Sequence, residues 1–406
     1  MSTEPMPTEP MPTEPMPTEP MQTEFMTSEV DVVIIGAGIV GAAAAFRLTD
    51  AGFRVVVLDR SVPNCAGSGT TAGNLHIQTI HTRRPGQGVA LDVRRLLPLQ
   101  LAASQLWDQL EHDVPGGVGL VRCGGYMVAE TEEQCDALAQ KHEWEREVGI
   151  PTRLLTGDEA RQELPLLGST IAGASWCGLD GYAEPDIAGP ALLSEAVARG
   201  AQLATDTKVT AIERIGESWN VSTAMGTWQA PHVVNAAGPW MAEVAAMVDV
   251  QLELRALSLQ MHTLAAPPET LNVLVQHVGE GISIKQDRRN RIVLGGGWPA
   301  GQFRTAGAAP IREESIAGNL AQTGRLMPGL GEIELSDVWT GPVVTTPDEL
   351  PIIGELESAP GVFVAGGTYS FTFASLWADV LTALVQGKEP AVDVSSFGPA
   401  RLTASH

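Results

Sequence analysis

Two short apolar runs near the start of the chain frame its clearest pattern. Val32–Ile35 and Val55–Leu58 contain only apolar residues, which is typical of strands buried on both faces. The stretch between them is rich in alanine and predicts a helix. Strand, helix and strand in this order predict a β-α-β unit.

The rest of the chain alternates between helical and strand patterns. Helices are predicted at 92–112, 131–148, 191–199 and 374–386. Strands are predicted at 124–129, 202–204, 209–214, 219–223 and 362–365, and the segment 231–240 is predicted to be a buried strand that breaks into a Gly-Pro turn. The β-rich region 250–300 contains a hairpin between 281–285 and 291–295. Because the last strand, glycine pair and helix resemble the first unit, nucleotide-domain segments at both ends predict an interleaved α/β architecture.

Glycines occupy the turn between the first strand and its helix. Gly36 permits a tight turn, Gly38 lets the backbone approach a pyrophosphate, and Gly41 lets the helix pack close to the sheet. Asp59 ends the second strand, where its carboxylate can accept hydrogen bonds from an adenosine ribose. An ordinary glycine-containing turn is the alternative. The complete order of strand, glycines, helix, strand and acidic residue favours a dinucleotide site.

Composition limits the remaining possibilities. A chain of 406 residues is long enough for two domains. Its 48 acidic and 25 basic residues give a net charge of −23, which disfavours binding to nucleic acid or anionic membranes. Four cysteines without C-x-x-C spacing predict no metal site and favour a cytoplasmic protein with reduced thiols. No apolar run approaches the length of a transmembrane helix.

Both ends of the chain are predicted to be tails. Residues 1–28 repeat Thr-Glu-Pro-like units with frequent methionine and proline, and such low-complexity composition predicts disorder. The segment lacks the basic and apolar regions of a secretory signal. Residues 396–406 are predicted to be a C-terminal tail.

Further motifs connect these elements to a known family. They are the loop 70–76, the segment 180–185, Asn-Ala-Ala-Gly-Pro-Trp at 235–240, Trp-Thr-Gly at 339–341, the segment 346–354 and Val-Ala-Gly-Gly at 364–367. With Gly36 to Gly41 and Asp59, the chain from 30 to about 390 resembles the D-amino-acid oxidase and glycine oxidase family of FAD enzymes. That family also includes sarcosine oxidases and flavin subunits of bacterial amine dehydrogenase complexes.

The resemblance implies an FAD-binding Rossmann-type domain interleaved with a β-rich substrate domain. The FAD-binding domain comprises 29–117, 188–249 and 338–395, and the substrate domain comprises 118–187 and 250–337. The residues expected to contact FAD are Gly36, Gly38, Ile39, Val40, Gly41, Asp59, Arg60, Thr70, Thr71, Ala72, Gly73, Asn74, Leu75, Val209, Ala237, Gly238, Trp240, Gly366, Gly367, Phe371 and Thr372.

Two departures from the family pattern concern the substrate. Many members carry an arginine that clamps a substrate carboxylate two residues after the glycine matching Gly341, and this chain has Val343 there. The segment 370–375 brings Phe371 and Phe373 to a position where the family has smaller residues. Both changes predict a different substrate, or a pocket that another subunit completes.

Three residues are the candidates for the catalytic side of the site. Lys285 lies on a predicted strand, opposite in direction to Ile284, and either pairs with a substrate carboxylate or is a solvated edge-strand lysine. His76 follows the cofactor loop and either orients substrate or is a structural histidine. Tyr369 follows the second glycine pair, with the same two possible roles.

The resemblance implies oxidation of a C–N bond in an amino acid or secondary amine, with hydride transfer to flavin N5 and hydrolysis of the imine. Such chemistry requires no dedicated base. The electron acceptor is oxygen or a partner subunit, as in an opine- or hydroxyproline-type dehydrogenase complex. An FAD-dependent alcohol or natural-product oxidase and a non-catalytic FAD-binding protein are also compatible with the same motifs.

Overall fold

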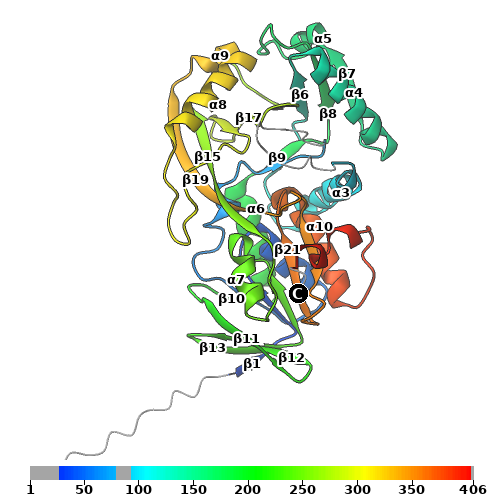
Figure 1. Ribbon diagram of the computed structural model, residues 1–406, viewed down its shortest axis with the longest axis vertical. Helices are drawn as coiled ribbons and strands as arrows, with labels where there is room; N and C mark the ends of the chain where they lie inside the picture. The colour runs from blue at the N-terminus through cyan, green and yellow to red at the C-terminus, as the bar shows by residue number, and fades with distance from the viewer. Residues whose placement is uncertain (1–26, 79–92, 404–406) are drawn as a thin grey trace, which may run out of the picture.

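The computed structural model describes residues 27–78 and 93–403, so the repeat segment 1–26 lies outside the described residues. The chain forms two regions stacked along the long axis of the molecule (Figure 1). A parallel sheet with helices occupies the lower part, and a second, larger sheet with its own helices occupies the upper part.

The lower region is built on a six-stranded sheet. Its strands are β2 (Val32–Ile35), β3 (Val55–Leu58), β10 (Gln202–Ala204), β14 (His232–Asn235), β20 (Ile352–Glu355) and β21 (Val362–Gly366). They lie in the order β10-β3-β2-β14-β21-β20, and β20 alone runs antiparallel to its neighbour. The expected β-α-β unit is confirmed, since α1 (Ile39–Asp50) connects two parallel neighbours.

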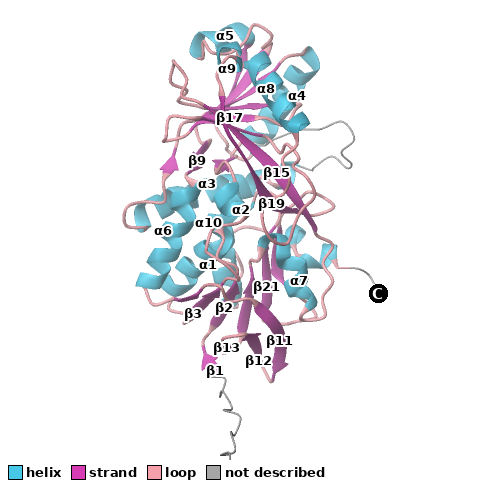
Figure 2. Cartoon of the chain, turned by 90° about the vertical axis from the view of Figure 1, so that its left-hand side faces the viewer, coloured by secondary structure: helices cyan, strands magenta, loops and turns pink. Residues whose placement is uncertain are grey.

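Helices flank this sheet on both sides, as Figure 2 shows. They are α1, α3 (Leu97–Asp113), α6 (Pro185–Ala198) and α10 (Ser370–Val385) on one side and α7 (Met241–Ala246) on the other. The helix α1 approaches α6 and α10 closely because Ala42–Ala45 are fully buried and carry no bulk. Trp377 and Phe46 fill the core between these helices.

The upper region is an eight-stranded sheet in the order β19-β15-β18-β17-β16-β6-β8-β7. Its strands are β6 (Gly125–Ala129), β7 (Thr152–Thr156), β8 (Gly173–Cys177), β15 (Arg255–Leu264), β16 (Leu274–His277), β17 (Ser283–Gln286), β18 (Ile292–Gly295) and β19 (Leu335–Thr345). Its helices are α4 (Glu132–Glu147), α5 (Gly157–Glu163), α8 (Glu313–Leu326) and α9 (Pro328–Gly331). The predicted hairpin is confirmed by the antiparallel pairing of β17 with β18.

Two small sheets complete the fold. One contains β1 (Thr27–Glu29), β11 (Val209–Ile215), β12 (Ser218–Thr223) and β13 (Gly226–Ala230), and the other contains β4 (Asn74–Leu75), β5 (Leu120–Val121) and β9 (Gly181–Ala183). The second sheet matters for the site, because β9 lies between the upper and lower regions (Figure 1) and pairs with β4 directly after the expected cofactor loop.

Two predicted helix starts are wrong. The helix expected from 191 begins at Pro185, whose fixed φ suits the first helical position, and continues through Pro190. The helix expected from 374 begins at Ser370. Phe373 is buried in the core and Phe371 packs against it, so the first turn of the helix packs inward. Tyr369, in a left-handed conformation, precedes the helix.

Both segments predicted to be tails include residues that form part of the fold. Residues 27–29 pair in parallel with β13, so the described structure begins inside the segment assigned to the N-terminal tail. At the other end, the short helices Ser395–Phe397 and Pro399–Leu402 pack against the fold. Phe397 is buried, and Arg401 donates hydrogen bonds to Asp348 and Pro351, which anchors the segment.

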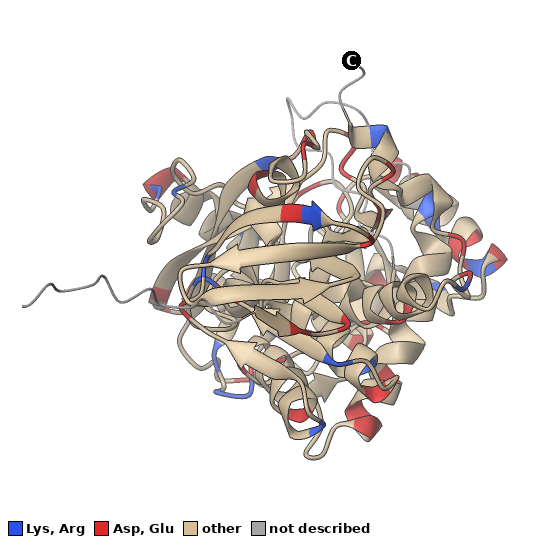
Figure 3. Cartoon of the chain, turned by 90° about the horizontal axis from the view of Figure 1, so that it is seen from below, with Lys and Arg blue, Asp and Glu red and all other residues tan. Residues whose placement is uncertain are grey.

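Figure 3 views the molecule from below, and the positions of Lys and Arg and of Asp and Glu are spread over the helices and loops. None of the described helices combines the length and the apolar character needed to cross a bilayer.

Candidate active site

The glycine turn after β2 has no room for side chains. Gly36 has a φ of +108°, and a Cβ atom on it would lie 2.5 Å from the Ala236 carbonyl oxygen. A Cβ on Gly41 would lie 1.9 Å from the Gly36 carbonyl oxygen. A Cβ on Gly38 would lie 2.8 Å from Ser68 Oγ. Gly36 and Gly41 therefore shape the turn, and Gly38 lets Ser68 approach the start of the helix.

The N-terminus of α1 follows this turn directly. Its first N–H groups have no acceptor within the helix, and the helix dipole adds positive potential. Ser68 Oγ accepts a hydrogen bond of 2.9 Å from Ile39 N, so a hydroxyl also lies at this end. The arrangement suits a phosphate group.

Asp59 lies beside the same turn. Its carboxylate accepts hydrogen bonds from Ala37 N at 2.7 Å and from Ser61 N at 2.9 Å. Burial raises the pKa of Asp59. Each carboxylate oxygen has a second acceptor site, so the side chain can hold the turn and also accept from a ribose hydroxyl. The ribose contact stays a prediction.

Residues expected at the adenosine end gather around Arg60. Its guanidinium lies 3.6 Å from the centre of the Trp240 ring and donates a hydrogen bond of 2.6 Å to the Thr305 carbonyl oxygen. Val209 comes close because Thr207 N donates to the Asp59 carbonyl oxygen at 2.7 Å. Ala237 and Gly238 follow β14 next to Gly36, and Gly238 adopts a φ of +53°.

The loop expected along the cofactor is held by β19 and β9. Trp339 Nε1 donates a hydrogen bond of 2.8 Å to the Thr70 carbonyl oxygen, and a Cβ on Gly341 would lie 1.9 Å from Thr70 Oγ1. Thr71 and Ala72 follow the short helix α2 (Gly67–Thr70). The loop then turns at Gly73, which has a φ of +72°.

The second glycine pair brings the start of α10 to the same place. Gly366 ends β21 and Gly367 turns with a φ of +86°. Thr372 Oγ1 accepts from His76 N at 3.2 Å, which joins α10 to the residue after β4. Phe371 stacks on Trp107 with a centroid distance of 5.8 Å. The two cofactor segments are therefore adjacent, although they lie far apart in the sequence.

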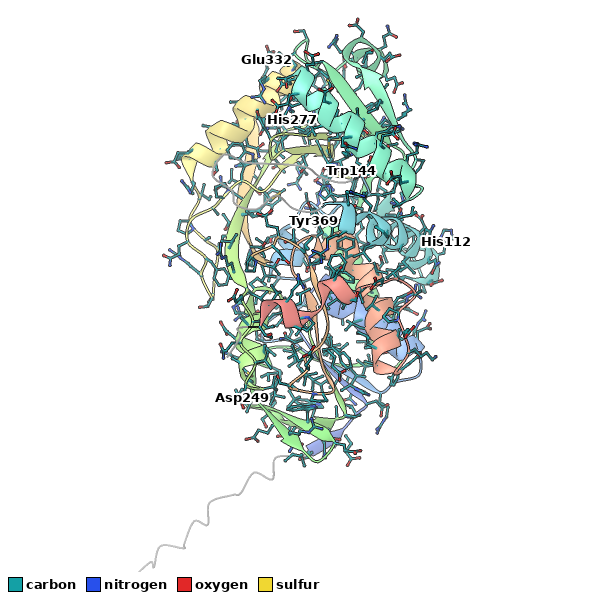
Figure 4. The ribbon with its side chains drawn as sticks, turned by 45° about the vertical axis from the view of Figure 1, so that its right-hand side comes forward. His112, Trp144, Asp249, His277, Glu332 and Tyr369 are labelled. Atoms are coloured by element: carbon teal, nitrogen blue, oxygen red, sulfur yellow. The ribbon has the colours of Figure 1, made fainter. Side chains whose placement is uncertain are left out.

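Two of the three catalytic candidates lie together. The rings of His76 and Tyr369 meet edge to face at a centroid distance of 6.3 Å, and Figure 4 shows Tyr369 at the junction of the two regions. Burial lowers the pKa of His76 to about 4, so its imidazole is neutral near pH 7. Burial raises the pKa of Tyr369, so its hydroxyl stays protonated.

The third candidate, Lys285, lies elsewhere on the same junction. Its side chain is 2% exposed on β17, which has a neighbour on each side, so the alternative of a solvated edge-strand lysine is wrong. Its ammonium nitrogen lies 3.4 Å from the centre of the Tyr182 ring. Burial lowers the pKa of Lys285 to about 8. Tyr182 pairs with Asn74, so the Tyr182 ring connects Lys285 to the cofactor loop.

The sequence interpretation missed two buried polar residues near the site. Gln276, on β16, lies beside His76 and is 1% exposed. Asp180 is fully buried and accepts hydrogen bonds from the backbone N–H groups of Ile77 and Gln78 at 2.8 and 2.9 Å. The sequence could have identified Gln276 because it is a polar residue within a pattern that predicts a buried strand.

These features fit a flavin dinucleotide. The close-packed glycine turn, the N-terminus of α1 and the acidic residue after β3 match the ADP portion of this cofactor. Polar atoms that are buried without partners among the described residues include Asn74 Oδ1, in the cofactor loop, and His76 Nδ1, just after it. The fold and site together define a two-domain flavoprotein.

The chain belongs to the DAO family of FAD dependent oxidoreductases, whose model matches residues 31–384. It is 30% identical to glycine oxidase of Geobacillus kaustophilus over 376 residues, or 91% of this chain and 97% of that protein. The crystal structure of that glycine oxidase superposes with a TM-score of 0.82, covering 92% and 99% of the two chains. An opine oxidase subunit of Rhizobium meliloti is 24% identical, covering 92% and 98%.

The family confirms the expected class: this chain is an FAD-dependent oxidoreductase of the kind that acts on amino acids and amines. An alcohol oxidase or a non-catalytic flavoprotein is not favoured. Within the described parts of the chain no cluster of three or more His, Cys, Asp or Glu side chains suits a metal ion. The four cysteines are free thiols.

Proposed function

We propose that this enzyme oxidises the C–N bond of an amine that also carries an anionic group, and that Lys285 binds this group. The substrate lies between the lower face of β16 and β17 and the cofactor segments of β4 and α10. The single observation that supports this placement is Lys285 itself, a buried cation without a carboxylate hydrogen-bonded to it among the described residues.

The position of the positive charge distinguishes this site from the family's arginine pattern. Val343, on β19, cannot bind a carboxylate, whereas Lys285 lies three strands away in the same sheet. A substrate held by Lys285 therefore presents its anionic group in a different direction from one held at position 343. N-substituted amino acids and amines with a distant carboxylate are the substrates that this geometry favours.

FAD held by the glycine turn, the loop 70–75 and the segment 366–372 would supply the hydride-accepting chemistry for oxidation of the C–N bond, and the imine would be hydrolysed by water. The chain's own residues position the substrate and control water. Phe371, on α10, and Trp107, on α3, stack on each other and form an apolar surface. The neutral His76 ring and the protonated Tyr369 hydroxyl provide hydrogen-bonding groups without adding charge. A neutral environment favours the neutral amine, from which hydride transfer is easiest.

Three finer assignments belong to the same proposal. The boundaries at 117, 187, 249 and 337 divide the FAD-binding and substrate domains, and the FAD contacts are those expected from the glycine turn, the loop 70–75 and the segment 366–372. The similarity to a subunit of opine oxidase supports an electron-accepting partner subunit. Free cysteines favour a cytoplasmic location.

The test is anaerobic titration of the FAD-loaded protein with secondary amines, opines and both enantiomers of amino acids. We expect bleaching of the flavin absorbance by amines that carry a carboxylate, and little bleaching by the corresponding neutral amides. Admission of air then shows whether oxygen is the electron acceptor. Failure of every amine to reduce the bound flavin would contradict the proposal.

A further inference from the structure

Gln276 and His76 form a pair of polar side chains whose hydrogen bonds are incomplete. The amide of Gln276 lies close enough to the His76 ring to oppose the lowering of its pKa. Neither amide atom makes a hydrogen bond of good geometry within residues 27–78 and 93–403, although the side chain is 1% exposed. His76 Nδ1 is also buried without a partner in those ranges. Native proteins rarely leave buried polar atoms unsatisfied, so each such atom requires an explanation.

The direction of Gln276 follows from the pairing of the strands. Ser283 lies directly opposite Gln276 on β17, and Lys285 lies two residues further along the same strand. Because alternate residues of a strand point to the same face, Gln276, Ser283 and Lys285 all face the same side of the sheet. Ile284 points to the other side, into the core of the upper region. Gln276 therefore shares the face that carries the proposed substrate cation.

The chemistry of this pair suits a neutral group. An amide offers a donor and an acceptor, and a neutral imidazole also offers one of each. Neither side chain carries charge to balance an ion, and bringing an unpaired ion into a buried position is costly. A hydroxyl or a carboxamide can satisfy the pair because each of these groups both donates and accepts.

We propose that Gln276 is a specificity-determining residue that hydrogen-bonds a neutral donor and acceptor group of the substrate, a hydroxyl or a carboxamide. This inference rests on the proposed function, since it places a second substrate group on the face that carries Lys285. The polar edge of the flavin ring also donates and accepts hydrogen bonds. The experiment therefore distinguishes a substrate group from the flavin as the partner of Gln276.

The test compares matched probes with the FAD-loaded enzyme under anaerobic conditions. Serine is compared with 2-aminobutyrate, and asparagine with leucine and aspartate, in both enantiomers and as N-methyl derivatives. We expect the hydroxyl and carboxamide probes to reduce the flavin with about ten- to hundredfold lower apparent Kd than their apolar counterparts. Gln276→Leu should remove that preference.

A matched control is Gln260→Leu. Gln260 is a fully buried glutamine on β15, but its Oε1 accepts a hydrogen bond of 2.8 Å from Arg312 N. Its replacement should lower the thermal stability and leave the probe preference intact. Gln276→Leu should instead keep or raise the stability of the substrate-free enzyme, because it removes an unsatisfied amide. A purely structural role for Gln276 predicts the opposite.

Each of the other possible results overturns one or both of the proposals. If the probes reduce the flavin without a preference for the hydroxyl or carboxamide, this inference is overturned and the proposed function stands. If Gln276→Leu changes the flavin spectrum or releases FAD before any probe is added, the amide binds the cofactor and the substrate role is refuted. If neither these probes nor the wider amine panel reduce the wild-type flavin, both proposals fail.

Discussion

The pKa of Lys285 gives the sharpest test of anion binding. Burial lowers this pKa from 10.5 to about 8, with Glu184 and other acidic groups opposing the shift. Only the protonated amine binds an anion well. The protonated fraction falls from about nine-tenths at pH 7 to about one-tenth at pH 9, so the dissociation constant of an anionic ligand should rise about tenfold, or about 1.4 kcal/mol.

Among the described residues near Lys285, no other group with a shifted pKa changes its charge between pH 7 and 9. Burial raises the pKa of the Cys123 thiol to about 11 and raises the pKa of the Tyr182 hydroxyl as well. The pKa of His76 is about 4 and that of Asp180 about 6. Between pH 7 and 9 these four groups keep their charge, so the expected slope belongs to Lys285.

The assay uses a carboxylate that has no amine, such as methylthioacetate, because a substrate amine would titrate in the same range. Its binding is followed by the change in the visible spectrum of bound FAD. The Lys285→Met variant should bind the ligand weakly, with a dissociation constant that does not change with pH. The Lys285→Arg variant should still bind the ligand, also with a constant that does not change with pH, because arginine stays charged. The corresponding amide should show no dependence on pH. The reasoning would be refuted if wild type and Lys285→Met bound the ligand with the same dissociation constant and neither constant changed with pH.

Three further perturbations test other parts of the structure. Gly38→Val fills the space beside Ser68 Oγ, so the purified variant should retain its far-ultraviolet circular dichroism but lose bound FAD. Burial raises the pKa of Asp180 from 3.8 to about 6, so its ionisation destabilises the folded state as the pH rises from 4 to 7; relative to Asp180→Asn, the free energy of unfolding of wild type should fall by about 2 kcal/mol over that range in urea titrations. Phe397→Ala should lower the free energy of unfolding by about 3 to 5 kcal/mol, whereas an unchanged value would mean that the C-terminal segment does not stabilise the fold.

Local patterns were sufficient to predict the cofactor half of the molecule. The turn Gly36 to Gly41 and the carboxylate of Asp59 lie within one β-α-β unit, so their spacing in the sequence determines their arrangement in space. The starts of α6 and α10 were missed because proline and glycine signals mark several positions that can begin a helix. Tertiary packing selects among such positions.

The substrate half could not be predicted in the same way. Alternation along the short strand β17 shows that Lys285 points away from Ile284, but it does not show what covers Lys285. That depends on Tyr182, which comes from the small sheet β4-β9-β5, and on β16, which is paired with β6 from a distant part of the chain.

The same long-range assembly explains why the absence of an arginine at position 343 does not exclude an anionic substrate. The sheet offers several positions on one face, and a cation on β17 can replace one on β19 if the substrate changes its orientation. Lys285 is less basic than an arginine because it is buried, so its binding of anions depends on pH, whereas an arginine clamp would stay charged. The site is therefore expected to lose affinity for anions above pH 8 even while deprotonation of the substrate amine favours hydride transfer. Those opposing effects predict a bell-shaped pH profile for flavin reduction by anionic amines, and a rising profile for neutral ones.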